Sequence, residues 1–513
     1  MKKVLFIALS VIFTLCGAVS AQESEKPVYA ICVSKSTIED PEWKEATTLL
    51  VQKHSEKFNV QVLGWGGSPL ACLEGLKKIQ PTYVCFLAKH EEANQIFVQM
   101  CHIITRRIDD DPYTDAIWAI LTGYDVNDVK RIIAAPDMKV DTCCAGFGLN
   151  LNQFKSGVWY SEGTKNHYGI KEADDVYQER KDGPDDTTHA IADAYGKNQL
   201  FMTSGHASPR DWQIGYSYKN GYFFSKDGQL YGRTKDKEEF PITHTNSKVY
   251  LAVGNCLIGN IADKDTMALA HIHSGGVNMM AGYVQPTFFG YMGWGIRDYY
   301  VGQPGRFTAA EAFFANNQAI TWHLNRVFPE YLNAYANAQS FIGWKNPMLW
   351  NDSTMKQMKL EQKDAVQILP GLPEDEIQKL LTKLFSQEFI LGMSFDLNMV
   401  ALYGDPAWQN PMQSHNKSWK QKLTSKKLDN GKTEWTLTII PLKGEESFNS
   451  VCKEEPTKNG RPIFQFLPKR IKNVVIDENC KDLHATITEN FILLPKTDAM
   501  SSGKEIVLKF TAE

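Results

Sequence analysis

Two apolar stretches decide how this chain folds: QLFMTSGHAS, which covers 199–208, and SKVYLAVGNCLIGN, which covers 247–260. Each is a short run of β-branched and aromatic residues ended by glycine, the pattern of a buried strand in a parallel sheet. The first run leads into His206 and the second into Cys256. Because open α/β sheets carry their functional groups at the carboxyl ends of the strands, we expect these two side chains at one sheet edge.

A histidine and a cysteine at neighbouring strand ends suggest a general base and a nucleophile. Cysteine is mostly thiol at pH 7, and a nearby imidazole is the usual means of forming the reactive thiolate. Taken alone, each residue has a simpler interpretation, since a buried cysteine commonly fills a core and a histidine commonly has a structural partner. The matched positions of His206 and Cys256 favour the catalytic interpretation.

The composition is that of an ordinary globular protein, with 513 residues, 43% of them hydrophobic and 22% charged, and a formal net charge of -4. This length allows two or three domains. The charge gives no indication of a nucleic-acid partner, and no later segment has the uninterrupted apolar length of a membrane-spanning helix. We therefore expect neither nucleic-acid binding nor membrane spanning, and the oligomeric state stays open.

The N-terminus has the pattern of a secretory signal. Lysines at positions 2 and 3 precede an apolar run over 4–15, and small residues at 19–21 suggest cleavage before Gln22. Residues 1–21 are therefore predicted to be a signal peptide, and the protein to be secreted or periplasmic.

Cysteine usage fits export with one reactive thiol. Of the ten cysteines, Cys16 falls in the predicted signal, and the remaining nine leave at least one unpaired, for which Cys256 is the candidate. Cys452 and Cys480 are a possible disulfide. None of the spacings forms the paired CxxC sets of a zinc site.

From Val28 onward, strand and helix signals alternate. We expect strands at 28–34, 59–65 and 81–88, with a helix beginning at Asp40-Pro41 and another over 70–79 between them. This βαβαβ order predicts a parallel, right-handed wound sheet. Residues 125–197 are expected to connect the two halves of the α/β part, and the polar stretch 172–198 to form surface helices and loops. Residues 308–390 are expected to be helical.

This layout resembles the caspase–legumain–gingipain group of cysteine peptidases, and within it the gingipain-like family. The resemblance is carried by Gly205-His206, by the turn Cys256-Leu257-Ile258-Gly259-Asn260, and by Leu402-Tyr403-Gly404-Asp405-Pro406 at the end of the α/β part. The family normally has glycine after the histidine, where its backbone N–H serves the oxyanion hole. This chain has Ala207, which keeps the N–H but disfavours positive φ.

The resemblance implies an α/β fold of the caspase-like kind: a doubly wound, mainly parallel sheet in two adjoining subdomains, followed by a small all-β immunoglobulin-like sandwich. The corresponding boundaries are 22–197 for the N-terminal α/β subdomain and connecting region, 198–412 for the catalytic subdomain and 413–513 for the sandwich. The residues themselves also predict an all-β end, since short alternating strands recur at 433–442, 461–468, 472–478, 484–495 and 504–513.

The resemblance also implies a function, that of an endopeptidase acting on protein or peptide substrates without a metal or cofactor. Cys256 would attack the scissile carbonyl, His206 would protonate the leaving amine, and the backbone N–H groups of Cys256 and Ala207 would bind the oxyanion. An inactive relative acting as a binding or scaffold protein is the alternative, supported by Ala207. A thiol amidase would use the same two residues, and sequence assigns no third group to orient His206.

Substrate contacts are expected on the loops 208–245 and 283–306. Asp211 is the acid nearest to His206 and Trp212 could stack on a guanidinium, whereas Trp294 belongs to an aromatic stretch that could line an apolar pocket. Basic and apolar preferences therefore both stay open. Two other polar groups, the histidines at 271 and 273 and the aspartates at 109–111, are interpreted as structural rather than metal-binding.

Overall fold

The computed structural model describes residues 26–327 apart from 174, 288 and 289, then residues 393, 396–415, 417–448 and 461–513. The predicted signal peptide, Cys452 and most of the helical prediction for 308–390 lie outside the described residues. Within them, the chain is mixed α/β, with one large, mainly parallel sheet and three small antiparallel sheets.

The first half of the large sheet forms as the sequence predicts. β1 (Val28–Ser34) pairs in parallel with both β2 (Asn59–Trp65) and β3 (Tyr83–Leu87), and β3 pairs with β4 (Ile117–Leu121). The connecting helices of this half are α1 (Lys35–Glu39), α2 (Pro41–Ser55), α3 (Leu73–Ile79), α4 (Gln95–Thr105) and α5 (Val126–Ala134). Asp40 caps α2 by accepting a hydrogen bond from the amide of Glu42, as expected for an Asp-Pro start.

The second half continues the same sheet beyond β4, and most of its strands run opposite to those of the first half. The full strand order is β2-β1-β3-β4-β16-β15-β14-β9-β5-β6-β7-β8. Its members are β5 (Thr142–Ala145), β6 (Ser156–Tyr160), β7 (Tyr168–Lys171), β8 (Gln178–Arg180), β9 (Leu200–Gly205), β14 (Lys248–Asn255), β15 (Val277–Tyr283) and β16 (Val400–Tyr403), with helices α6 (Thr188–Lys197) and α7 (Met267–His273). Because β16 is parallel to β4 and antiparallel to β15, it joins two half-sheets whose strands run in opposite directions.

The connecting region 125–197 contains strands that the sequence pattern does not predict. β5 and β6 lie inside this stretch and extend the parallel sheet beside β9. The strands are short, and the segment around them is polar, so a sequence pattern based on long apolar runs misses them.

The insertion after His206 forms a separate antiparallel sheet. Its strands are β10 (Asp211–Gln213), β11 (Tyr222–Lys226), β12 (Gln229–Arg233) and β13 (Glu239–Ile242), and it packs on α6 and α7. The Asp227-Gly228 pair turns the β11–β12 hairpin, with both residues at positive φ, as a two-residue hairpin requires. The Asn220-Gly221 pair, a common hairpin signal, does not turn a hairpin, because Asn220 is buried and its side chain bonds Thr187.

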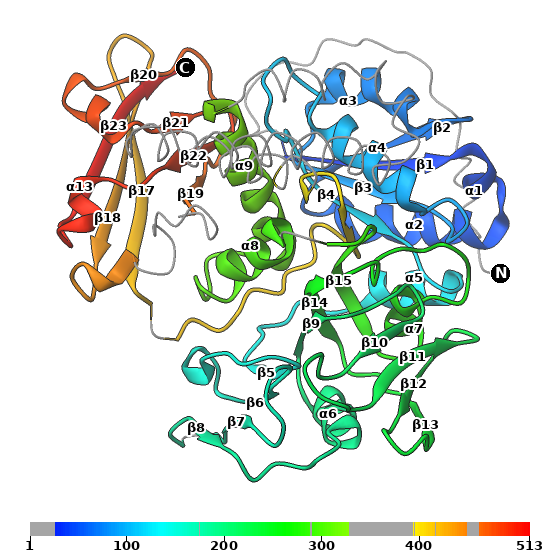
Figure 1. Cartoon of the computed structure of the whole chain (residues 1–513). Helices are drawn as coiled ribbons and strands as arrows, with labels where there is room; N and C mark the ends of the chain where they lie inside the picture. Colours follow the sequence, from blue (N-terminus) through cyan, green and yellow to red (C-terminus); the bar gives the residue numbers. More distant parts are fainter. Residues whose placement is uncertain are drawn as a thin grey trace, which may run out of the picture.

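The C-terminal part is mainly β within the described residues, with one short α-helix, α13 (Asp498–Ser501). One sheet contains β17 (Trp419–Lys427), β18 (Thr433–Pro441), β23 (Ile506–Ala512) and β20 (Val475–Ile476), and the other contains β19 (Ile463–Phe466), β22 (Phe491–Leu494) and β21 (Thr486–Ile487). A common apolar core lies between them. We call these two the C-terminal sheets. Figure 1 places them beside α8 (Tyr291–Tyr300) and α9 (Ala309–Val327), with the large sheet on the other side of these helices.

The Gly-Asp-Pro sequence ends β16, as predicted, and also anchors the first half-sheet. Gly404 has a φ of 132, and the carboxylate of Asp405, fully buried, accepts hydrogen bonds from Tyr29, Lys53 and His54. Burial alone would raise the pKa of Asp405, but the His54 hydrogen bond and the Lys53 charge bring it well below its ordinary value.

None of the helices in the described part of the chain has the length and apolar character that crossing a bilayer requires.

Candidate functional site

The register of two neighbouring strands brings His206 and Cys256 to one edge of the large sheet. β9 and β14 are parallel, and Gly205 at the end of β9 lies opposite Asn255 at the end of β14. His206 and Cys256 are the next residues on the two strands. Asn255 ties the two ends together, because its side chain donates a hydrogen bond to the carbonyl of Gly205 and accepts one from Thr203.

Cys256 opens a tight and strained turn. Its neighbour Leu257 has a φ of 58, a left-handed conformation that costs a branched residue energy and is found most often at functional sites. The turn is held against β15 and the residues after it: the amides of Leu257 and Gly259 donate to the carbonyls of Gln285 and Tyr283. The backbone N–H of Thr287 donates to the Cys256 sulfur at 3.3 Å, and the sulfur also lies 3.6 Å from the Thr287 carbonyl oxygen, to which the thiol can donate.

Cys256 also differs from the other cysteines in exposure. Among those in the described part of the chain, it alone is not buried. Cys480, predicted to pair with Cys452, is buried, and its sulfur accepts a hydrogen bond from the amide of Lys509. A soluble thiol reagent should therefore reach Cys256 more readily than the other described thiols.

His206 is exposed. The nearest described ring is that of Tyr216, edge-on with a centroid separation of 6.1 Å. Within the described residues no hydrogen bond joins the His206 ring to Cys256. Catalytic hydrogen bonds are often long or absent before substrate binds, so the arrangement is compatible with a dyad that closes on substrate.

Two backbone N–H groups at this edge are free to act as donors. Among the hydrogen bonds of the described residues, none uses the amide of Ala207 or that of Cys256. Ala207 forms an antiparallel bridge with Trp212 and has no positive φ. The positive φ falls instead on Gly205, at 92. The alanine therefore occupies a backbone conformation that any residue adopts, and its β-carbon introduces no strain.

The three predicted substrate contacts have different surroundings. Asp211 is half-buried at the start of β10, and its carboxylate has no ion-pair partner within the described residues. Trp294, on α8, lies at the expected edge: a β-carbon on Gly254 would be 3.6 Å from its indole nitrogen, and its ring meets Phe147 edge-on at 5.1 Å.

The prediction for Trp212 is wrong. The side chain is 1% exposed, its indole N–H donates to the carbonyl of Ser204, and its ring packs on Phe201 and Phe223. An indole enclosed in this way has no free face for a guanidinium. It supports the His206 loop from beneath, because Trp212 also pairs with Ala207.

Glu162 is a site residue that sequence reasoning missed. It follows β6, whose carboxyl end lies at the same edge as those of β9 and β14. A β-carbon on Gly205 would lie 3.7 Å from its Oε2, and this oxygen is buried without a hydrogen-bond partner in the described residues. Burial raises the pKa of Glu162, while a hydrogen bond with the Ser204 side chain opposes the rise. The only sequence signal was an acid two residues after a strand that we did not recognise.

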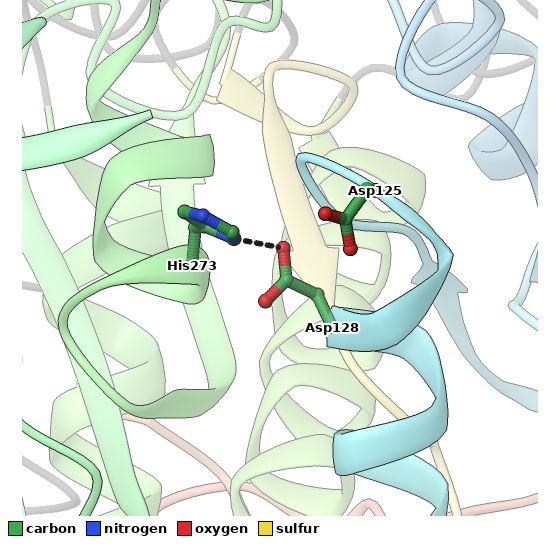
Figure 2. Close-up of side chains that lie close together, drawn as sticks. All are labelled: Asp125, Asp128 and His273. Atoms are coloured by element: carbon green, nitrogen blue, oxygen red, sulfur yellow. Dashed lines mark hydrogen bonds and ion pairs between the residues drawn. The ribbon is translucent and has the colours of Figure 1, made fainter. Parts of the chain in front are cut away.

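Two groups of side chains elsewhere have the spacing of metal ligands. Asp125, Asp128 and His273 have ligand atoms within 4.8 Å of one another, and Figure 2 shows His273 of α7 facing Asp128 of α5. Asp128 already accepts from His273 and from the amide of Tyr124, so these groups stabilise one another without an ion. His271 instead bonds Tyr195, so the two histidines diverge as expected.

The second group consists of Asp109, Asp115 and Glu489, where the C-terminal sheets meet the large sheet. Arg470 donates to Glu489 and to the backbone carbonyl of Asp115. The arginine supplies one positive charge against three carboxyl groups. Both groups lie away from the Cys256 edge and are not part of the candidate site.

Comparison with known proteins does not identify this chain: no family model, no curated protein and no solved structure matches it.

Proposed function

We propose that this protein is a cysteine endopeptidase in which Cys256 is the nucleophile and His206 the acid–base. The observation that carries the proposal is the register of β9 and β14, which delivers the two residues side by side from adjacent parallel strands. The strained turn at Leu257 and the hydrogen bond from Thr287 to the sulfur add support.

In the proposed reaction, the Cys256 sulfur bonds to the scissile carbonyl carbon while His206 carries the proton that the thiol has lost. The free amides of Ala207 and Cys256 bind the oxyanion. The C–N bond then breaks, and His206 gives its proton to the leaving amine. Water, deprotonated by His206, hydrolyses the thioester and restores the thiol.

Glu162 is the proposed partner of the His206 imidazolium. Its carboxyl has one unpartnered oxygen beside Gly205, the residue that precedes His206. A carboxylate in that place would orient the ring and stabilise the positive charge that the ring carries in the transition state. Glu162→Gln is expected to lower turnover. The loss should be largest at the pH at which the imidazolium of His206 must form.

We also propose a family and a domain architecture for this chain. The chain would be a gingipain-like peptidase with a caspase-like α/β part and an immunoglobulin-like C-terminal part, exported by the segment 1–21. Support comes from the Gly205-His206 and Cys256 motifs at one sheet edge and from the strand that ends at Gly404. The two opposed half-sheets are the place where two adjoining subdomains would meet.

Substrate preference keeps two alternatives. Glu162 and Asp211 offer carboxylates for a basic side chain, whereas Trp294 and Tyr216 offer aromatic surface near the same edge. Because Trp212 is buried, it cannot stack on a guanidinium of the substrate. Fluorogenic peptides that differ only in the residue before the cleaved bond decide between arginine and phenylalanine or leucine.

Thiol labelling tests the dyad and its main rival, an inactive binding or scaffold protein. An iodoacetamide probe, with labelled peptides resolved by mass spectrometry, should modify Cys256 faster than the other mature cysteines, because it is more exposed than the other described thiols and the proposed His206 partner would activate it. In His206→Ala the rate at Cys256 should fall. Equal rates in the two folded proteins would favour the scaffold, and a thiol amidase would label normally without cleaving peptides.

A further inference from the structure

The turn that carries Cys256 is held by a segment that leads away from the site. Tyr283, at the end of β15, accepts a hydrogen bond from the Gly259 amide through its backbone carbonyl. Four residues on, Thr287 donates to the Cys256 sulfur. The position of the sulfur therefore depends on the position of Tyr283 and of the residues that follow it.

The hydroxyl of Tyr283 is fixed in turn by a buried carboxylate. It donates to Asp396 Oδ2 at 2.9 Å and accepts from the amide of Gly293 at 3.0 Å. The same oxygen of Asp396 accepts from the amide of Met292. Asp396, fully buried, thus joins the end of β15 to the first turn of α8, the helix that carries Trp294.

The C-terminal sheets reach the same place through one arginine. Arg461, which lies two residues before β19 and is 4% exposed, donates to the backbone carbonyl of Tyr291 and forms an ion pair with Asp298. Both acceptors belong to α8. Asp298, one of the acids in the loop 283–306, is therefore engaged by Arg461.

We propose that Asp396 and Tyr283 are positioning residues for Cys256, and that Arg461 couples the C-terminal sheets to the nucleophile through them. The connected path runs from Arg461 to the first turn of α8, then to Asp396, to Tyr283, and through the Tyr283 backbone to the Cys256 turn. The role in turnover rests on the proposed function, whereas the effect on the thiol does not.

Charge explains why Arg461 matters. Burial raises the pKa of Asp396 to about 7, while hydrogen bonds from Tyr283 and from the amides of Met292 and Tyr291, together with the Arg461 charge, oppose the rise. Without Arg461, more of the carboxyl is protonated at neutral pH. A neutral carboxyl is a weaker acceptor for Tyr283 and the helix amides, and the loop that holds the thiolate loosens.

The test measures how iodoacetamide labelling of Cys256 depends on pH in the full chain. Tyr283→Phe removes one hydroxyl, Asp396→Asn removes the charge, and Arg461→Gln removes the arginine's charge and its ion pair with Asp298. Arg470→Gln is the matched control, since Arg470 also joins the C-terminal sheets to the large sheet but does so at Asp115 and Glu489. Each variant is first checked for folding by its denaturation midpoint.

The midpoint of the labelling curve should rise by about half a pH unit in the three path variants, which is about a threefold lower rate below the midpoint. Arg470→Gln should keep the wild-type midpoint. Folded Tyr283→Phe and Arg461→Gln proteins with an unchanged midpoint would overturn the proposal, as would an equal shift in Arg470→Gln. Should Asp396→Asn fail to fold, the other two variants decide. Shifted midpoints in a protein that cleaves no peptide would contradict the peptidase and leave the positioning role standing.

Discussion

Single residues at the Cys256 edge differ in backbone conformation. Ala207 occupies an ordinary backbone conformation, and the unusual ones fall on Gly205 and Leu257. The alanine after the histidine therefore does not have to adopt a positive φ. Ala207 differs from the glycine of the family that the sequence resembles. Its backbone N–H is nevertheless free of hydrogen bonds among the described residues.

Ala207→Gly should accordingly leave peptide turnover nearly unchanged. No positive φ has to be relieved at this position, and the amide that would bind the oxyanion is present in both proteins. The measurement is kcat/KM on one fluorogenic peptide. A gain of about tenfold, equivalent to about 1.4 kcal/mol of transition-state stabilisation, would mean that alanine does displace the oxyanion site.

At the scale of elements, close packing of β14 on β15 positions the turn that carries Cys256. A β-carbon on Gly259 would lie 2.3 Å from the carbonyl oxygen of Gly282, so only glycine fits at this place. The hydrogen bond from Tyr403 to the Gly259 carbonyl adds a third strand, β16, to the support of the turn.

Gly259→Ala should therefore displace the turn. We expect the unfolding free energy to fall by about 1–3 kcal/mol, as for an overpacked core, and the labelling rate of Cys256 to change with it. Gly66→Ala is the control, because a β-carbon there meets nothing within 4 Å and needs no positive φ. Urea denaturation checks the prediction, and equal stabilities of the two variants would refute it.

The same scale explains what the sequence could and could not predict. β1, β2, β3, β9 and β14 are apolar runs bounded by turn signals, and their parallel arrangement was predicted from the pattern of the sequence. β17 was missed because its outward residues are mostly lysine, serine and threonine, as suits an edge strand. β5 and β6 were missed because they are short, and Glu162 was missed with them.

Contacts between residues far apart in sequence lie outside what periodicity can predict. The partner of Tyr283 is Asp396, and that of Asp298 is Arg461. Local pattern fixes which residues are buried in a strand, but only the packed chain brings these groups together.

At the scale of the whole molecule, the C-terminal sheets share a core with the α/β part. Phe464, Phe466 and Phe491 meet Phe314 of α9, and Tyr113 meets Phe491 edge-on at 5.3 Å. Beside this apolar contact, Arg470 and Asn490 both donate to the carbonyl of Asp115. The aromatic contact and the polar one together fix the two parts against each other.

The acidic group at this interface should make stability depend on pH. Burial, then the charges of Asp109, Asp111 and Glu489, raises the pKa of Asp115 to about 10, against about 3.9 for an unfolded aspartate. The folded state therefore binds more protons between these two values, and its unfolding free energy falls as pH rises through that window. Asp115→Asn removes this titration while its side-chain oxygen can still accept from Ile108 and Asp109.

Relative to Asp115→Asn, the wild type should lose at least about 1 kcal/mol of unfolding free energy between pH 5 and pH 8. Urea denaturation in the presence of a chelator measures the difference, and Asp110→Asn, at an exposed position, is the control. A wild type that gains on the variant as pH rises would show the carboxylates to be stabilised in their charged form.

The proposal that Cys256 and His206 form a peptidase is tested most directly by digestion of a peptide library. The wild-type protein, Cys256→Ala and His206→Ala are incubated with the same library, and new termini are read by mass spectrometry. We predict cleavage by the wild type, none by Cys256→Ala, and at most a trace by His206→Ala, because the thiolate and the proton donor act as a unit. An intact library after incubation with folded wild type, or cleavage that survives in Cys256→Ala, would contradict the account.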